Sequence, residues 1–80
     1  MEKQAYSYEG FTLKQWRERF DITQIDLCNV INKGTGGNLS EVTVSYWENG
    51  KFQPSNIYKS QIARAIEHFK GLKKESEAVN

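Results

Sequence analysis

The 80-residue chain is predicted to form one compact all-α domain of four or five helices. Four segments begin with a Ser or Thr that precedes apolar residues at helical spacing, and this pattern is typical of a helix N-terminus. No segment shows a strand pattern, a domain linker or a useful internal repeat. Two Trp and four Phe supply bulky side chains for a single small core.

The helical pattern covers residues 11–72, which form the expected domain. Residues 1–10 have no helical period and are assigned to an N-terminal arm. Tyr6 and Tyr8 alternate with polar residues, which would suit a short extended segment, but an end without fixed structure is the main expectation. Residues 73–80 are polar and are assigned to a frayed tail.

The first helix is predicted over residues 13–20. Thr12 suits the N-cap, and Gln15, three residues later, completes a capping box in which each side chain bonds the backbone of the other residue. Phe11 before the cap and Trp16 after it have the spacing of a hydrophobic staple.

The same signals predict a second and a third helix. Thr23 caps the second helix and Ser40 caps the third, which Gly50 ends in the left-handed C′ position. Residues 32–38 contain three Gly and two Asn, so the second helix is expected to stop there. The predicted inner faces hold Leu27, Cys28 and Ile31 on the second helix and Val44 and Trp47 on the third.

Ser55, directly after Pro54, caps a fourth helix that is expected to run to about residue 72. Its apolar stripe consists of Tyr58, Ile62, Ala65, Ile66 and Phe69. Nothing after Phe69 shows a fresh cap and stripe, so a fifth helix is either missing or merged with the fourth.

Composition excludes several classes of protein. No apolar run approaches the roughly 20 residues that span a membrane, and the N-terminus is polar, so a soluble cytoplasmic protein is expected. Cys28 and His68 are each the only residue of their kind, which argues against a disulfide, a metal site and a nucleophile–base pair. We therefore expect no enzyme, no cofactor and no small-molecule substrate.

Several segments, taken in order, resemble the Cro/repressor family of helix-turn-helix regulators, which are common in phages and bacteria. The matching segments are Leu13-Lys14, Trp16-Arg17, Ile22-Thr23-Gln24, Thr43-Val44-Ser45, Trp47-Glu48-Asn49-Gly50-Lys51, Pro54-Ser55 and Ile62-Ala63-Arg64-Ala65-Ile66. The resemblance implies a lambda-repressor-like fold in which the turn of the motif is lengthened by about six Gly-rich residues.

The resemblance also implies roles for individual residues. Arg17 and Glu48 would form an internal ion pair. The third helix would enter the major groove of operator DNA, with Glu41, Val42, Thr43 and Tyr46 at base-reading positions and Ser45 on the same outer face. Phosphate contacts would come from Gln24, Ser40, Asn49 and Lys51. Capping alone would explain Ser40 and Asn49 equally well, and Gln24 would otherwise be solvated.

Two functions remain open from the sequence. The first is a small transcriptional regulator that binds double-stranded operator DNA as a homodimer. The second is an antirepressor that uses the same helix to cover the DNA-binding domain of a repressor protein. Charge favours the second, because residues 23–51 contain two Lys against three carboxylates and Glu41 lies at the tip of the third helix.

Overall fold

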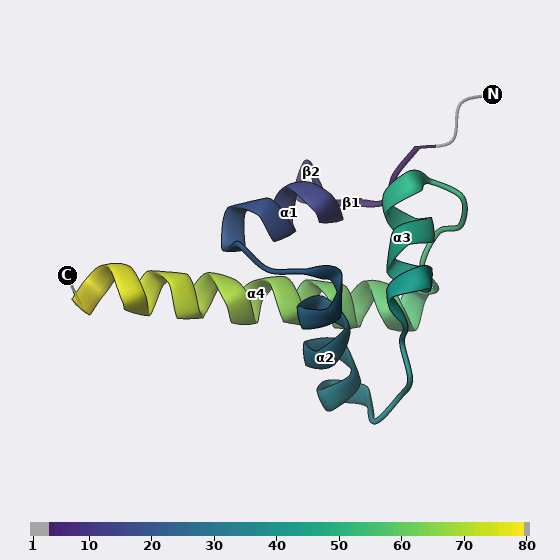
Figure 1. Ribbon diagram of the computed structural model, residues 1–80. Helices are drawn as coiled ribbons and strands as arrows, with labels where there is room; N and C mark the ends of the chain where they lie inside the picture. Colours follow the sequence, from purple (N-terminus) through teal and green to yellow (C-terminus); the bar gives the residue numbers. More distant parts are fainter. Residues whose placement is uncertain (1–3, 80) are drawn as a thin grey trace.

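The computed structural model describes residues 4–79, and describes side chains for residues 4–72. A short hairpin and four helices follow one another along this part of the chain (Figure 1). They are β1 (Ser7–Tyr8), β2 (Phe11–Thr12), α1 (Leu13–Phe20), α2 (Gln24–Thr35), α3 (Glu41–Asn49) and α4 (Asn56–Val79). The expectation of a mainly helical small domain is confirmed, with the hairpin as an addition.

Helix α1 begins and ends as the sequence predicts. Thr12 Oγ1 accepts from the Gln15 backbone N at 3.2 Å, and Gln15 Oε1 accepts from the Thr12 backbone N at 2.8 Å. The rings of Phe11 and Trp16 meet edge to face with centroids 5.3 Å apart. These local contacts fix the angle at which the chain enters α1.

The second helix ends within residues 32–38, as predicted, but the turn does not begin at Asn32, because α2 continues through Asn32 and Gly34 to Thr35. A Gly inside a helix costs only about 1 kcal/mol relative to Ala, and packing of α2 against α3 and α4 offsets that cost. The helix ends at Gly36, which has a φ of 72° and donates its N–H to Asn32 O at 2.7 Å. The irregular link to α3 is therefore residues 36–40, shorter than the expected turn of residues 32–38.

Helix α3 has its predicted ends, with Ser40 as N-cap and Gly50 in the left-handed conformation. Helix α4 is longer than predicted. It extends to Val79, so the expectation of a frayed tail after residue 72 is wrong for residues 73–79, while Asn80 lies outside the described residues. Residues 73–79 contain no Gly or Pro, and their Lys, Glu and Ala residues are good helix formers.

The expectation of no strands is also wrong. Strands β1 and β2 pair in antiparallel fashion across a two-residue turn, in which Glu9 and Gly10 have φ values of 49° and 85°. Positive φ at both central residues is typical of tight hairpin turns. Trp16 Nε1 donates to Tyr8 O at 2.9 Å and holds the hairpin on α1, so residues 4–10 are not a free end.

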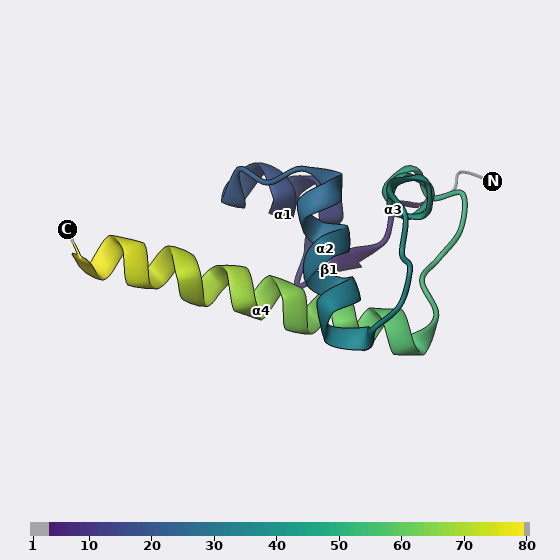
Figure 2. The same ribbon diagram turned by 60° about the horizontal axis from the view of Figure 1, so that its bottom comes forward.

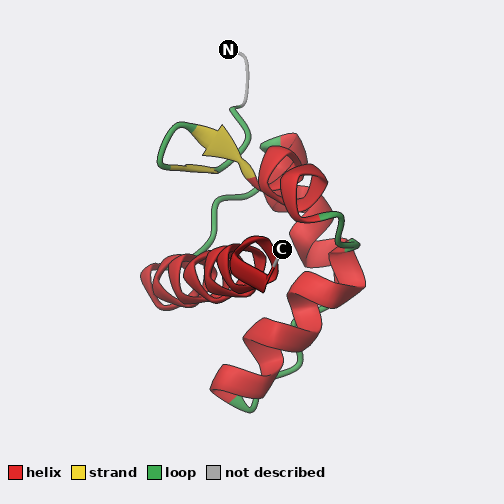
Figure 3. Ribbon diagram, turned by 90° about the vertical axis from the view of Figure 1, so that its left-hand side faces the viewer, coloured by secondary structure: helices red, strands yellow, loops and turns green. Residues whose placement is uncertain are grey.

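Helices α1 and α2 each pack against α3 and against α4 (Figures 2 and 3). Figure 3 shows α1, α2 and α3 on one side of α4. All four helices contribute to the core, which consists of Leu13, Trp16, Leu27, Cys28, Ile31, Leu39, Val44, Trp47, Ile62, Ala65 and Ile66. Within the described residues, no helix has the length and apolar character needed to cross a membrane.

Cys28 belongs to this core, as predicted, and is 5% exposed. Burial raises the pKa of its thiol, so the thiolate is disfavoured. Cys28 is therefore a small apolar filler, because a reactive cysteine needs an exposed position and a lowered pKa.

Candidate functional site on helix α3

Helix α3 lies at the edge of the molecule (Figure 1), and its side chains are buried on one side and exposed on the other. Val44 and Trp47 are buried against the core, at 0% and 3% exposure. Val42, on the opposite side, is 58% exposed. We name the open side the α3 face; its residues are Glu41, Val42, Thr43, Ser45, Tyr46 and Asn49. The structure thus places six of the nine residues expected to touch a partner on one side of α3.

Ser40 and Asn49 make contacts at the two ends of this face. Ser40 Oγ accepts from the Thr43 backbone N at 3.4 Å and lies 3.3 Å from Thr43 Oγ1. Asn49 Nδ2 donates to Ser45 Oγ at 3.3 Å. Both residues are exposed, so each stabilises the helix while remaining accessible to a partner.

Tyr46 is covered in part by the segment that follows α3. The rings of Tyr46 and Phe52 meet edge to face at 5.3 Å, and Lys51 Nζ lies 4.6 Å from the centroid of the Tyr46 ring. Phe52 is itself 56% exposed, so it extends the α3 face beyond the helix. Phe52 lies outside every helical stripe, so the sequence pattern does not identify it as a site residue; its only signal is its position two residues after Gly50.

Arg17 and Glu48 form the ion pair that the resemblance implies. Arg17 Nε lies 2.7 Å from Glu48 Oε2 and Arg17 Nη2 lies 2.9 Å from Glu48 Oε1. Glu48 raises the pKa of Arg17 through these hydrogen bonds. Gln24 Nε2, expected to contact a phosphate, donates instead to Glu48 Oε1 at 2.9 Å. Gln24 therefore joins the N-terminus of α2 to the end of α3.

These pairings change the electrostatic character expected of the α3 face. Glu48 is only 6% exposed and is neutralised by Arg17. The Asp26 carboxylate accepts from the Thr23 backbone N at 2.9 Å and so caps α2. Of the three carboxylates between residues 23 and 51, Glu41 alone belongs to the α3 face. The face is therefore less acidic than the sequence count indicates.

Residues 4–6 lie beside the C-terminal end of α3. The Tyr6 backbone N donates to Trp47 O at 3.0 Å, and Gln53 Nε2 donates to Gln4 O at 2.8 Å. Figure 1 shows the chain passing from this point into β1. Residues 4–6 thus help to fix the C-terminal end of α3.

Among the residues that the structure describes, no group of three or more His, Cys, Asp or Glu side chains could hold a metal ion. Comparison with protein-family models, with curated proteins and with solved structures finds no match to this chain. The function is therefore inferred from the residues of the α3 face and their contacts.

Proposed function

We propose that the protein is a small helix-turn-helix transcriptional regulator that binds operator DNA as a dimer, with α3 in the major groove. The observation that supports this most strongly is the presentation of α3. Its outer residues are accessible while its inner residues are buried, and the ion pair of Arg17 and Glu48 ties it to α1. A recognition helix needs this combination of an open face and a fixed orientation.

Each residue of the α3 face suits a defined contact. Val42 would pack against thymine methyl groups, and Glu41 would accept a hydrogen bond from cytosine N4. Thr43 and Tyr46 would add contacts to base edges. Ser40, Asn49 and Lys51 would hold the phosphates on either side of the groove, while Gln24 would act through Glu48 rather than on a phosphate.

The charge of the α3 face is compatible with DNA binding, because the ion pair of Arg17 and Glu48 removes one carboxylate from the count. Glu48 is neutralised within the protein, so Glu41 supplies the main repulsion between the α3 face and phosphate. Lys51 is exposed at the other end of the face. We expect modest non-specific affinity that weakens as salt rises, because few cations contact the backbone.

Selection from a random duplex library, followed by fluorescence anisotropy on the selected sequence, tests this function. Val42→Ala should weaken binding by about tenfold, because it removes two carbons that would each contribute about 0.8 kcal/mol when buried against thymine. Ile57→Ala is the matched control, because Ile57 is 73% exposed but lies on α4. If the folded protein enriches no sequence and binds no duplex at low salt, DNA binding is excluded.

The second candidate function, an antirepressor, is favoured by one specific observation. Val42 and Phe52 are 58% and 56% exposed, and Tyr46 lies against Phe52, so the face has more apolar surface than a phosphate-contacting helix requires. With Glu41 at its edge, this surface would complement a basic reading surface on a repressor. Co-purification with a repressor encoded nearby would test this function directly.

Glu41→Gln separates the two functions by the sign of its effect. Against non-specific duplex DNA the change removes repulsion and should strengthen binding. Against a basic repressor surface it removes an attraction and should slow association, most clearly at low salt. A variant that changes neither reaction would show that the α3 face is not the binding surface.

A further inference from the structure

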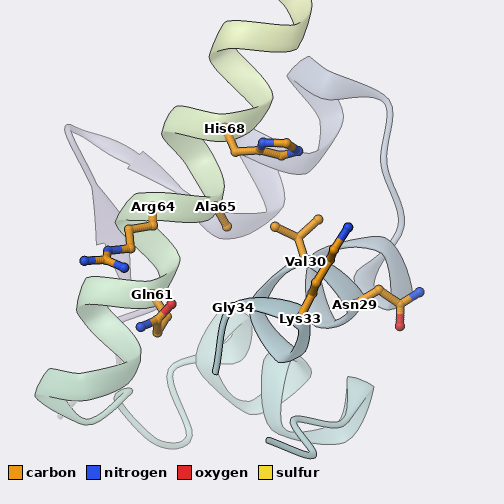
Figure 4. A pocket seen from close by; sticks show the side chains of 8 residues that line it. All are labelled: Asn29, Val30, Lys33, Gly34, Gln61, Arg64, Ala65 and His68. Carbon is orange, nitrogen blue, oxygen red and sulfur yellow. The ribbon is translucent and has the colours of Figure 1, made fainter. Parts of the chain in front are cut away.

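A second surface of the molecule has the properties of a binding groove. It lies between the C-terminal half of α2 and the middle of α4, has a volume of about 440 Å³, and receives no residue from α3 (Figure 4). Its lining consists of Asn29, Val30, Lys33 and Gly34 from α2 and Gln61, Arg64, Ala65 and His68 from α4. The α3 face and this groove are therefore separate surfaces.

The groove has an apolar floor and one basic residue on each helix, which we name the basic rim: Lys33 on α2 and Arg64 on α4, whose side chain extends on the side of α4 away from α2 (Figure 4). Val30 and Ala65 supply apolar side chains between the two helices, as Figure 4 shows. Lys33 and Arg64 are exposed and have no hydrogen bond or ion pair among the residues whose side chains are described. His68 also lines the groove, and none of the lining residues in the described part of the chain is a carboxylate. Such a surface complements an anion that also has an apolar part.

Regular helix spacing explains why these side chains share one groove. Gln61, Arg64 and His68 are separated by three and four residues, so they lie on one face of α4. Lys33 follows Asn29 by one turn on α2. Gly34 faces Gln61 across the groove, since a Cβ on Gly34 would lie 3.3 Å from Gln61 Oε1, the end of a flexible side chain.

We propose that this groove binds an acidic amphipathic peptide segment of a partner protein. The apolar residues of the segment would lie over Val30 and Ala65, and its carboxylates would pair with Lys33 and Arg64. The groove is open to solvent rather than enclosed, whereas sites for small molecules usually enclose most of the ligand. A peptide can follow two adjacent helices and place several carboxylates along the basic rim. This proposal does not depend on whether the α3 face binds DNA.

The test uses a synthetic helical peptide of about 16 residues, with Leu at helical spacing and Glu on both flanks. A control peptide has Gln in place of every Glu. Addition of the Glu peptide to ¹⁵N-labelled protein should shift the amide signals of residues 29–34 and 61–68. Binding should weaken as the salt concentration rises.

Charge reversal supplies the matched variants. Lys33→Glu and Arg64→Glu should each raise the Kd of the Glu peptide by about fivefold, because each change replaces an attraction with a repulsion. Lys59→Glu is the control, since Lys59 is exposed on α4 but lies outside the groove. The amide spectrum of each free variant confirms that it remains folded.

Several results would overturn the proposal. These are equal binding of the Gln peptide, shifts centred on the α3 face, an equal loss in Lys59→Glu, or no shift at millimolar peptide. Inorganic phosphate or glutarate is added separately. If either alone shifts the same amides as strongly as the peptide does, the groove is a small-anion site rather than a peptide site.

Discussion

Arg17 in α1 and Glu48 in α3 form a two-bond ion pair, with distances of 2.7 Å from Nε to Oε2 and 2.9 Å from Nη2 to Oε1. The side chains are 17% and 6% exposed. Gln24 from α2 donates to the same carboxylate, so three helices meet at Glu48. This junction sets the orientation of α3 and therefore of the α3 face.

Arg17→Met should lower the free energy of unfolding by about 3 kcal/mol, because it leaves a buried carboxylate without its cation. The double variant Arg17→Met/Glu48→Leu should recover most of that loss, since no charge then remains buried. Urea unfolding of the wild type, both single variants and the double variant gives the coupling energy. Independent, additive losses would show that the pair contributes little.

Trp47→Ala should unfold the domain or nearly so. Trp47 is 3% exposed, and its ring lies 5.4 Å from that of Tyr58. Truncation of a buried Trp costs about 3–5 kcal/mol, a large part of the stability of a small domain. Trp47→Phe keeps part of the volume and should melt at an intermediate temperature by circular dichroism. A wild-type melt for Trp47→Ala would contradict the inward position of Trp47.

Asn32 closes the link between α2 and α3. Its Nδ2 donates to Leu39 O at 3.0 Å, and its Oδ1 accepts from the Leu39 backbone N at 2.7 Å. Asn32→Ala leaves both groups without a partner and should cost about 1–3 kcal/mol. Amide hydrogen exchange at Leu39 should accelerate. Asn38→Ala, an exposed change within the same link, should leave that exchange unchanged.

Substitution by alanine should change the free energy of unfolding in opposite directions at Gly36 and Gly71. Gly36 has a φ of 72°, so Gly36→Ala should cost about 1 kcal/mol even though nothing lies within 4 Å of the added methyl group. Gly71 lies inside α4 with the same free space, so Gly71→Ala should add up to about 1 kcal/mol. Urea midpoints measure both changes, and shifts of the same sign would contradict the assigned backbone conformations.

Lys70 connects the hairpin turn to α4. Its Nζ lies 2.9 Å from Glu9 Oε2 and 2.9 Å from Glu67 Oε2. The hydrogen bond from Lys70 lowers the pKa of Glu9. Because the folded pKa is lowered, the contribution of Glu9 to stability is complete above its unfolded value near 4.5 and is lost as pH falls through the folded value.

NMR titration of the Glu9 side chain should therefore give a higher pKa in Lys70→Met than in the wild type. The stability difference between the wild type and Glu9→Gln should also shrink as pH falls below about 4.5. An identical Glu9 titration in the wild type and Lys70→Met would show that the contact does not persist in solution.

The beginnings of α1, α2 and α3 are determined by short-range bonds and are readable from the sequence. Thr12, Thr23 and Ser40 each accept from a backbone N–H three residues later, so both partners lie within one turn. The inward position of Val44 and Trp47 follows from helical spacing alone. For the same reason, the residues of the α3 face could be named in advance.

Tertiary contacts decided the features that the sequence analysis missed. Each strand of the hairpin has two residues, too few for a strand pattern, and the hairpin is held instead by Trp16 and Lys70. Helix α2 continues past Asn32 because packing on α3 and α4 offsets the propensity of Gly34. The hydrogen bond from Gln24 to Glu48 joins residues that are far apart in the sequence. The contact between Phe52 and Tyr46 involves a residue that lies outside the helices. A sequence pattern reports which residues share one helical face, whereas the partner of that face is set only when distant segments pack together.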